Sequence, residues 1–136
     1  MNTTYFLNCV AGNVFGSKAD PAIPQHYYVG LSTTEPSVDG SNVSEPSTGA
    51  GYGRVSLDGR LGEPDGGVVE NSSSIDFNES TASWGTITHF VIYDAETVGE
   101  GNLLMYGELS APRSVEASTI MTIRVGYLKL SALNPA

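Results

Sequence analysis

The sequence predicts a mainly β fold: an antiparallel β-sandwich, or an open barrel, of about seven to nine short strands with one short N-terminal helix. Three observations lead to this fold class. Short runs rich in β-branched and aromatic residues recur along the chain, turns rich in Gly and Pro separate them, and helical spacing is confined to the first sixteen residues. With 136 residues, the chain is long enough for one domain with one hydrophobic core.

The start of the chain favours a helix. Asn2 or Thr3 can cap it, because a side-chain oxygen at that position accepts a hydrogen bond from a free backbone N–H. Phe6, Val10 and Val14 then follow at the i, i+4, i+8 spacing of one helix face. A helix this short is marginal alone, so it must pack against something.

We therefore divide the chain into an N-terminal helix that is a candidate attachment segment, residues 1–16, and a single β-sandwich domain, residues 17–136. Phe6, Leu7 and Val10 are candidate contacts with another subunit or with a larger particle. The alternative is that these three side chains pack on the core of their own domain.

The first half of the β domain contains four segments of strand-like composition. Asp65-Gly66 is a pair typical of a tight hairpin turn, so the chain should reverse there. The polar stretch between the first two segments is punctuated by Pro and Gly and is expected to be a long loop at residues 33–53. The expected strands are His26–Ser32, Tyr52–Leu57, Val68–Asn71 and Ser74–Phe77.

The segment Thr86–Asp94 carries apolar side chains on both faces, which is typical of a central strand. Leu103–Ser110 is expected to return beside it as an antiparallel neighbour. One face of the central strand should hold Ile87, His89, Val91 and Tyr93, and the other Thr88, Phe90 and Ile92.

The C-terminal part shows the alternation of a half-buried strand. Met121, Ile123 and Val125 are expected to face the core. Gly126 interrupts this pattern, so a second short strand is expected at Tyr127–Leu130.

The charge balance excludes some classes of partner. Six Lys and Arg face fifteen Asp and Glu, a net charge of −9, and such a surface repels nucleic acid and anionic membranes. Cys9 is the only cysteine, so no intrachain disulfide can form. The N-terminus has no signal-peptide pattern, and no run approaches the ~20 apolar residues that span a bilayer. We expect a protein made in a cytoplasm-like compartment without a signal peptide and not inserted in a membrane.

No pattern of catalytic residues stands out. Two His and one Cys are too few for a usual zinc site, and neither a nucleophile elbow nor a phosphate-binding loop is present. The acidic stretch around Asp39 lacks the alternating ligands and the final Glu of a calcium loop. We expect no enzymatic activity, no cofactor and no metal; a pair of facing carboxylates that hydrolyses glycans is the enzymatic alternative.

The long loop is the main candidate for an interaction site. A structureless loop of this length inside a compact domain is uncommon unless it has a function. We expect Glu45 and Pro46 to be interface residues and Tyr52 to be an anchor, since aromatic residues dominate interface energetics. The alternative is that the loop wraps around its own sandwich.

Trp84 lies between a loop and the central strand. Together with Tyr52 it is a candidate glycan contact, because aromatic rings can stack on sugars. The alternative for Trp84 is that it closes one end of the hydrophobic core.

Four segments in a fixed order resemble a family of small tailed-bacteriophage proteins, commonly labelled phage tail fibre or minor structural proteins. These segments are YYVGLSTTEP, GSNVSEPSTGAGYGRV, ESTASWGTITHFVIYDA and GNLLMYGELSAPRSVEASTIMTIRVGYLKLS. The resemblance extends from about Phe6 to Ala136. It implies a non-enzymatic structural component of the virion, on the tail or its fibres. It also implies a homo-oligomer, with a trimer as the expected state, that contacts other virion proteins.

Two other functions remain open from the sequence. One is a capsid decoration or head-fibre protein on the outside of the phage head. The other is a carbohydrate-binding module that contacts a glycan of the host surface.

Overall fold

The structure, a computed structural model, describes residues 1–16 and 22–131. One helix lies at the N-terminus, and eight strands follow. The helix is α1 (Thr4–Val14), and a 3₁₀ turn, η1, spans Thr48–Ala50. The strands are β1 (Tyr28–Ser32), β2 (Val55–Ser56), β3 (Val69–Glu70), β4 (Ile75–Asp76), β5 (Gly85–Tyr93), β6 (Leu103–Val115), β7 (Thr122–Ile123) and β8 (Lys129–Leu130).

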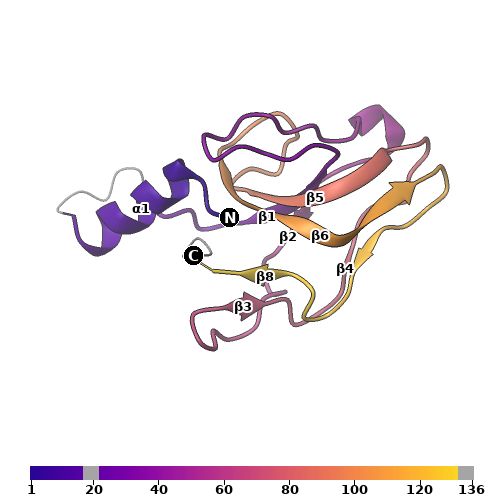
Figure 1. The fold of residues 1–136 in the computed structure, drawn as a ribbon. Helices are drawn as coiled ribbons and strands as arrows, with labels where there is room; N and C mark the ends of the chain where they lie inside the picture. The colour runs from indigo at the N-terminus through magenta and orange to yellow at the C-terminus, as the bar shows by residue number, and fades with distance from the viewer. Residues whose placement is uncertain (17–21, 132–136) are drawn as a thin grey trace.

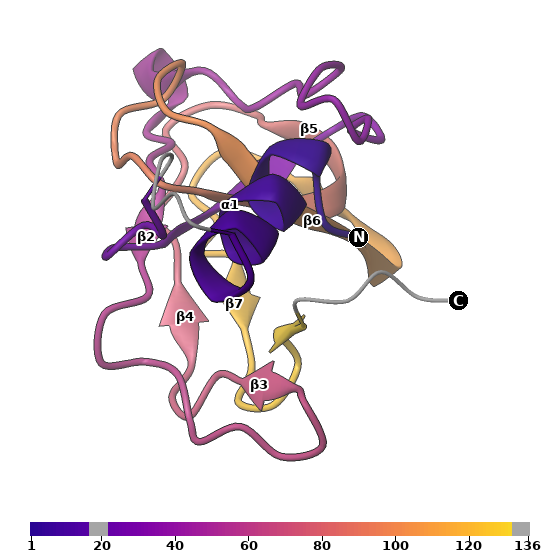
Figure 2. The same ribbon diagram turned by 90° about the vertical axis from the view of Figure 1, so that its left-hand side faces the viewer.

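The strands form two layers. The larger layer is a four-stranded antiparallel sheet in the order β2-β1-β5-β6. The second layer consists of two short antiparallel ribbons, β3–β8 and β4–β7. Figure 1 shows β3, β4 and β8 below the sheet and α1 to one side of the β domain, and Figure 2 views the molecule from the side on which α1 lies. The predicted mainly β, antiparallel fold with one N-terminal helix is confirmed, although the second layer is two ribbons and not one continuous sheet.

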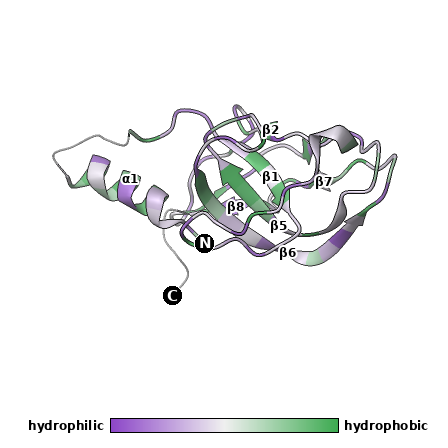
Figure 3. Cartoon of the chain, turned by 90° about the horizontal axis from the view of Figure 1, so that it is seen from above, coloured by the Kyte–Doolittle hydropathy of each residue, from purple (hydrophilic) through white to green (hydrophobic). Residues whose placement is uncertain are grey.

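The main core lies between the two layers. Its fully buried side chains come from the sheet, as with Leu31, Ile92 and Leu104, and from the ribbons, as with Ile75. Hydrophobic residues are concentrated on the central strands β1 and β5, while the outer part of β6 is more polar (Figure 3). Burial of these apolar faces, at roughly 25 cal/mol per Å², holds the layers together.

One predicted strand pairing and one predicted turn are confirmed. β5 and β6 are antiparallel neighbours over nine and thirteen residues. The chain reverses at Asp65–Val68, where Gly66 and Gly67 both have positive φ (62° and 81°). Backbone hydrogen bonds join Asp65 and Val68 in both directions, at 2.9 and 3.1 Å. Positive φ favours residues without a Cβ, and the two glycines adopt it without strain.

The predicted alternation fails at two places. Val125 is 56% exposed, because the chain turns at Arg124–Tyr127 directly after β7 and places Val125 at the tip of the turn. Ile87 belongs to the main core with Ile92, although it was expected on the face of Val91. The cause is a register shift between Ile87 and His89.

β6 continues beyond the predicted end at Ser110 because a bulge lets it rejoin β5. Glu108 lies opposite His89, and Arg113 lies opposite Ile87. Four residues of β6, 109–112, therefore stand opposite the single residue Thr88. Such a bulge bends the strand and redirects its side chains.

Gly30 in β1 leaves room for two side chains of the loop at residues 33–53. A Cβ at this position would lie 2.5 Å from the Tyr52 hydroxyl and 2.9 Å from a Glu45 carboxylate oxygen. We predict that Gly30→Ala lowers the free energy of unfolding by about 1–3 kcal/mol, the usual cost of overpacking. Urea denaturation measures this change. Gly53→Ala is the control, since its Cβ would have Asn78 as nearest neighbour at 3.5 Å; an equal loss in both variants would contradict the prediction.

Candidate functional site

The loop at residues 33–53 is folded, and its first half closes on itself. The backbone N–H of Thr33 donates to the Ser44 carbonyl at 2.9 Å, and the Thr34 hydroxyl donates to the Asn42 carbonyl at 2.6 Å. The Asn42 amide in turn donates to the Glu35 carbonyl at 2.8 Å. Short polar side chains thus supply the backbone hydrogen bonds that a loop does not obtain from a sheet.

A buried ion pair fixes the second half of the loop. The Arg54 guanidinium donates to both carboxylate oxygens of Glu45, at 2.7 and 3.1 Å. The two side chains are only 0% and 7% exposed. Two parallel N–H···O bonds of this kind are directional as well as strong, so they set the position of Glu45 relative to β2.

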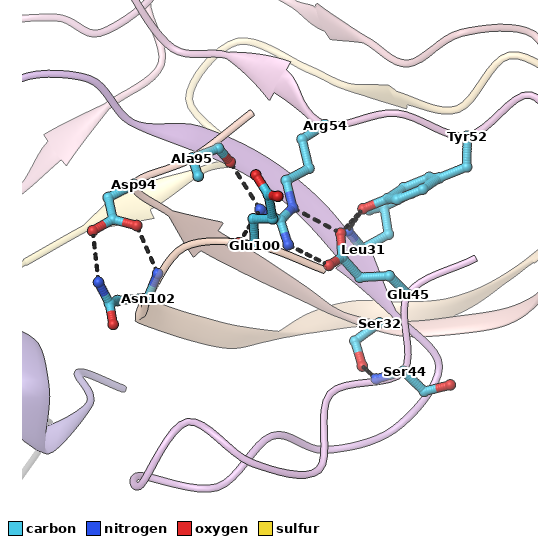
Figure 4. A network of polar contacts seen from close by, with 10 residues as sticks. All are labelled: Leu31, Ser32, Ser44, Glu45, Tyr52, Arg54, Asp94, Ala95, Glu100 and Asn102. Atoms are coloured by element: carbon cyan, nitrogen blue, oxygen red, sulfur yellow. Dashed lines mark hydrogen bonds and ion pairs between the residues drawn. The ribbon is translucent and has the colours of Figure 1, made fainter. Parts of the chain in front are cut away.

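Arg54 also reaches across the sheet (Figure 4). Its Nη1 donates to the carbonyls of Ala95 and Glu100, at 2.8 and 2.9 Å, in the connection between β5 and β6. Its guanidinium carbon lies 3.7 Å from the centre of the Tyr93 ring. A single side chain therefore joins the long loop, the β5–β6 connection and an aromatic ring of β5.

Tyr52 completes the anchor. Its hydroxyl donates to Glu45 at 2.5 Å and accepts the backbone N–H of Leu31 at 2.9 Å. Burial, followed by the charge of Glu45, raises the pKa of Tyr52 well above its usual value. The ring packs edge-on against Trp84, with centroids 5.4 Å apart, and stacks on Phe77 at 6.4 Å. The loop is thus held by polar contacts at one end of this ring and by the core at the other.

The predicted exposure of Trp84 and Tyr52 as glycan contacts is wrong. Trp84 is 4% exposed and Tyr52 is 3% exposed. The Trp84 indole N–H donates to the Ala50 carbonyl at 2.9 Å, so both rings use their polar atoms within the chain. Trp84 instead follows the alternative, in which it closes the end of the core.

The candidate interface residues of the loop also have partners within the chain. Glu45 binds Arg54 and Tyr52, Pro46 is buried, and Tyr52 lies in the core. The loop wraps around its own domain, as the alternative predicted. Its contact with a second subunit stays a prediction.

Residues 1–3 attach the N-terminus to the outer edge of β6. Backbone hydrogen bonds join Met1 and Tyr106 in both directions, at 2.6 and 2.9 Å, and the Thr3 N–H donates to the Leu104 carbonyl at 2.9 Å. Thr3 also caps α1, since its hydroxyl accepts the Phe6 N–H at 3.3 Å. The base of the helix is therefore tied to the sheet edge.

α1 has a buried base and an exposed tip. Phe6 and Cys9 are buried, and Val10 packs against the main core. Val14 and Phe15, in contrast, are 60% and 88% exposed at the end that projects from the β domain (Figures 1 and 2). Phe6 and Val10 thus follow the alternative of packing on their own core, and Leu7 is half-buried. Sequence reasoning missed Phe15 as the exposed apolar residue.

The histidines and acidic residues of the described part do not gather into a metal-binding group. Within residues 1–16 and 22–131, no group of three His, Cys, Asp or Glu side chains could hold a metal ion. His26 pairs with Asp58 at 2.9 Å on the surface, and the His89 ring contacts the Thr88 hydroxyl at 2.8 Å. No helix in the described part is long and apolar enough to cross a bilayer.

These features describe a braced β scaffold with a projecting helix, and comparison with known proteins gives its class: a structural fibre protein of a bacteriophage virion. The chain belongs to the family described as podophage GP4 fiber I protein gp80, whose model matches residues 2–131. This match confirms the resemblance to phage tail-fibre proteins. Among curated proteins, none matched the chain.

We predict that breaking the buried ion pair strongly destabilises the domain. Arg54→Met leaves the Glu45 carboxylate buried without its cation and should lower the free energy of unfolding by about 3–5 kcal/mol. The double variant Arg54→Met/Glu45→Leu should lose clearly less than the sum of its single variants. Lys129→Met is the control, because Lys129 and Glu70 form an exposed pair that should contribute less than about 1 kcal/mol. Urea denaturation would contradict this prediction if Arg54→Met and Lys129→Met lost equal stability.

We also predict that stability falls at alkaline pH. The folded state raises the pKa of Tyr52, so above about pH 10 it binds more protons than the unfolded state does. Titration of Tyr52 should therefore add no pH dependence to the free energy of unfolding below that pH. Above it, the free energy of unfolding should decrease by up to about 1.4 kcal/mol per pH unit. Denaturation at a series of pH values measures the slope. Tyr52→Phe should make the slope shallower, and an unchanged slope would refute the assignment.

Proposed function

We propose that this chain is a non-enzymatic structural subunit of a podophage tail fibre, which acts through contacts with copies of itself and with another virion protein. Membership in a phage fibre family supports the structural role. The observation that carries the attachment part is the exposed apolar tip of α1, Val14 and Phe15, on a helix whose base is fixed to β6.

The N-terminal helix suits attachment because its two ends differ. The base buries Phe6 and Cys9 and continues into the backbone pairing of residues 1–3 with β6. The tip leaves two large side chains in water, and their burial against a partner would stabilise the complex by about 1.5–3 kcal/mol for each side chain fully buried. A helix tied to the sheet at one end presents the other end in a defined direction.

The braced loop supports a scaffold role. An open binding loop normally leaves polar groups free for a ligand, whereas Arg54, Glu45 and Tyr52 direct theirs toward one another. The loop therefore adds rigidity to the domain. Rigid subunits suit a fibre, since the orientation of each subunit then fixes the orientation of the next one along the fibre.

We predict that Val14→Ser/Phe15→Ser weakens attachment without unfolding the domain. Loss of two apolar contacts should reduce the affinity for phage particles assembled without this protein by about 10- to 100-fold. Co-sedimentation with such particles measures binding. Val38→Ser, which changes a 45% exposed apolar side chain outside the helix, is the matched control.

The Cys9 thiol reports whether the helix stays docked in the variant. Burial raises its pKa and excludes reagents, so labelling should be slow in both proteins. A variant that binds as tightly as the wild type, with Cys9 still protected, would contradict attachment through α1. The number of copies in each particle separates the two locations: a few to a few tens fits a tail fibre, and hundreds would place the protein on the head.

A further inference from the structure

A large hollow lies between the bulge of β6 and the β7–β8 segment. It is a groove of about 740 Å³. Leu109 and Ala111 of the bulge form one wall, and Tyr127 and Leu128 form the other, with Phe90 of β5 also lining it. The groove lies where residues 109–112 of β6, four residues opposite the single Thr88, bend away from β5.

Half of the cations of the chain line this groove. Arg113, Arg124 and Lys129 are three of its six Lys and Arg residues. Lys129 pairs with Glu70, whereas the guanidinium groups of Arg113 and Arg124 have no ion pair within the described part of the chain. Glu108 also lines the groove, so its four charged side chains carry three positive charges and one negative charge. In a protein with a net charge of −9, this net positive groove is a local site for an acidic partner.

The surroundings of the groove have the composition of a protein interface. Tyr127, which lines the groove, is 69% exposed, and Ile120 and Val125 on the same segment are 57% and 56% exposed outside its lining. Val125 lines a separate pocket with Glu63 and Asp65. Aromatic side chains and Arg are enriched in interfaces, and apolar groups rimmed by charge are typical of docking surfaces. The partner should thus carry carboxylates, and it should be narrow enough to enter the groove between β6 and the β7–β8 segment.

The chain itself carries a segment with that chemistry. The turn at residues 63–68 is narrow, because Gly66 and Gly67 both take positive φ, and residues 63–67 are exposed. Glu63 and Asp65 lie on it, and neither carboxylate has an ion pair within the described residues. No residue of this turn lines the groove.

We propose that the acidic turn of one copy inserts into the cationic groove of the next copy. This inference rests on the self-assembly part of the proposed function and names the surfaces involved. The two surfaces are different patches of one chain, so the contact is heterologous, and it closes into a ring only when the rotation between neighbouring copies divides a full turn. Figure 2 shows the turn at the end of the molecule marked by β3, and residues 63–67 are exposed there. Three copies would close the ring if the rotation between neighbours is 120°, in agreement with the expected trimer.

Neutral variants test the contact from both sides. Arg113→Gln/Arg124→Gln in the groove and Glu63→Gln/Asp65→Asn in the turn should each weaken self-association by about 10- to 100-fold. Arg60→Glu is matched to the groove variant, since both change the net charge from −9 to −11. Glu96→Lys is matched to the turn variant, since both change it from −9 to −7. Both controls should associate like the wild type in sedimentation velocity measurements.

A charge exchange provides the decisive result. Arg113→Glu/Arg124→Glu alone and Glu63→Lys/Asp65→Lys alone should each abolish self-association. The chain that carries all four substitutions keeps the net charge of −9 and should recover self-association. Circular dichroism and urea denaturation of every variant establish that it is folded. Recovery of association by the exchanged chain supports the contact.

Three outcomes would overturn the inference. If the groove and turn variants associate like the wild type, the subunits meet elsewhere, and the proposed function stands. If only the groove variants fail, and they lose binding to particles, the groove takes another virion protein. If the wild type is a monomer at every concentration, self-assembly and this contact both fail, whereas attachment through α1 is judged separately by co-sedimentation.

Discussion

The bidentate contact between Arg54 and Glu45 is the interaction on which the arrangement of the loop depends. It brings a cation from the start of β2 to a carboxylate in the middle of a polar loop, with both side chains removed from water. Burial of an ion pair is costly unless the remaining hydrogen-bonding groups are satisfied. Here Tyr52, Ala95 and Glu100 supply those bonds. The pair therefore positions the loop more than it stabilises the fold, because a wrong loop position would leave a buried charge alone.

This constraint extends to both ends of the sheet. Tyr52, which is hydrogen-bonded to Glu45, packs in the main core against Trp84 and Phe77. Arg54 is hydrogen-bonded to the β5–β6 connection. On the opposite edge, β6 is occupied along residues 103–106 by the N-terminal segment. Beyond that stretch the bulge bends the same strand outward. One edge strand thus supports the helix at one end and forms the groove at the other.

Patterns in short stretches of sequence predicted the strand segments and the tight turn. The apolar runs of β5 and β6 indicated their pairing, and Asp65-Gly66 indicated its turn, because each depends on neighbouring residues alone. The bulge of β6 and the exposure of Val125 depend on how distant segments meet, so alternation could not reveal them. The pairing of Arg54 with Glu45 depends on the fold of the whole loop. Among the site residues, Phe15 had the clearest signal: consecutive residues of a helix point about 100° apart, so it lies off the face formed by Phe6, Val10 and Val14.

The proposed contact between copies of this acidic chain has to overcome electrostatic repulsion between them. A net charge of −9 on every subunit opposes close contact unless charges of opposite sign meet locally. The structure meets this requirement by separating its charges: one cation is enclosed with Glu45, and three gather in the groove. The buried pair has no charge left for a neighbour, whereas Arg113 and Arg124 have no ion pair within the described residues. Under the proposed contact, the order of the loop depends on Arg54 and association depends on Arg113 and Arg124, so that either can change without disturbing the other.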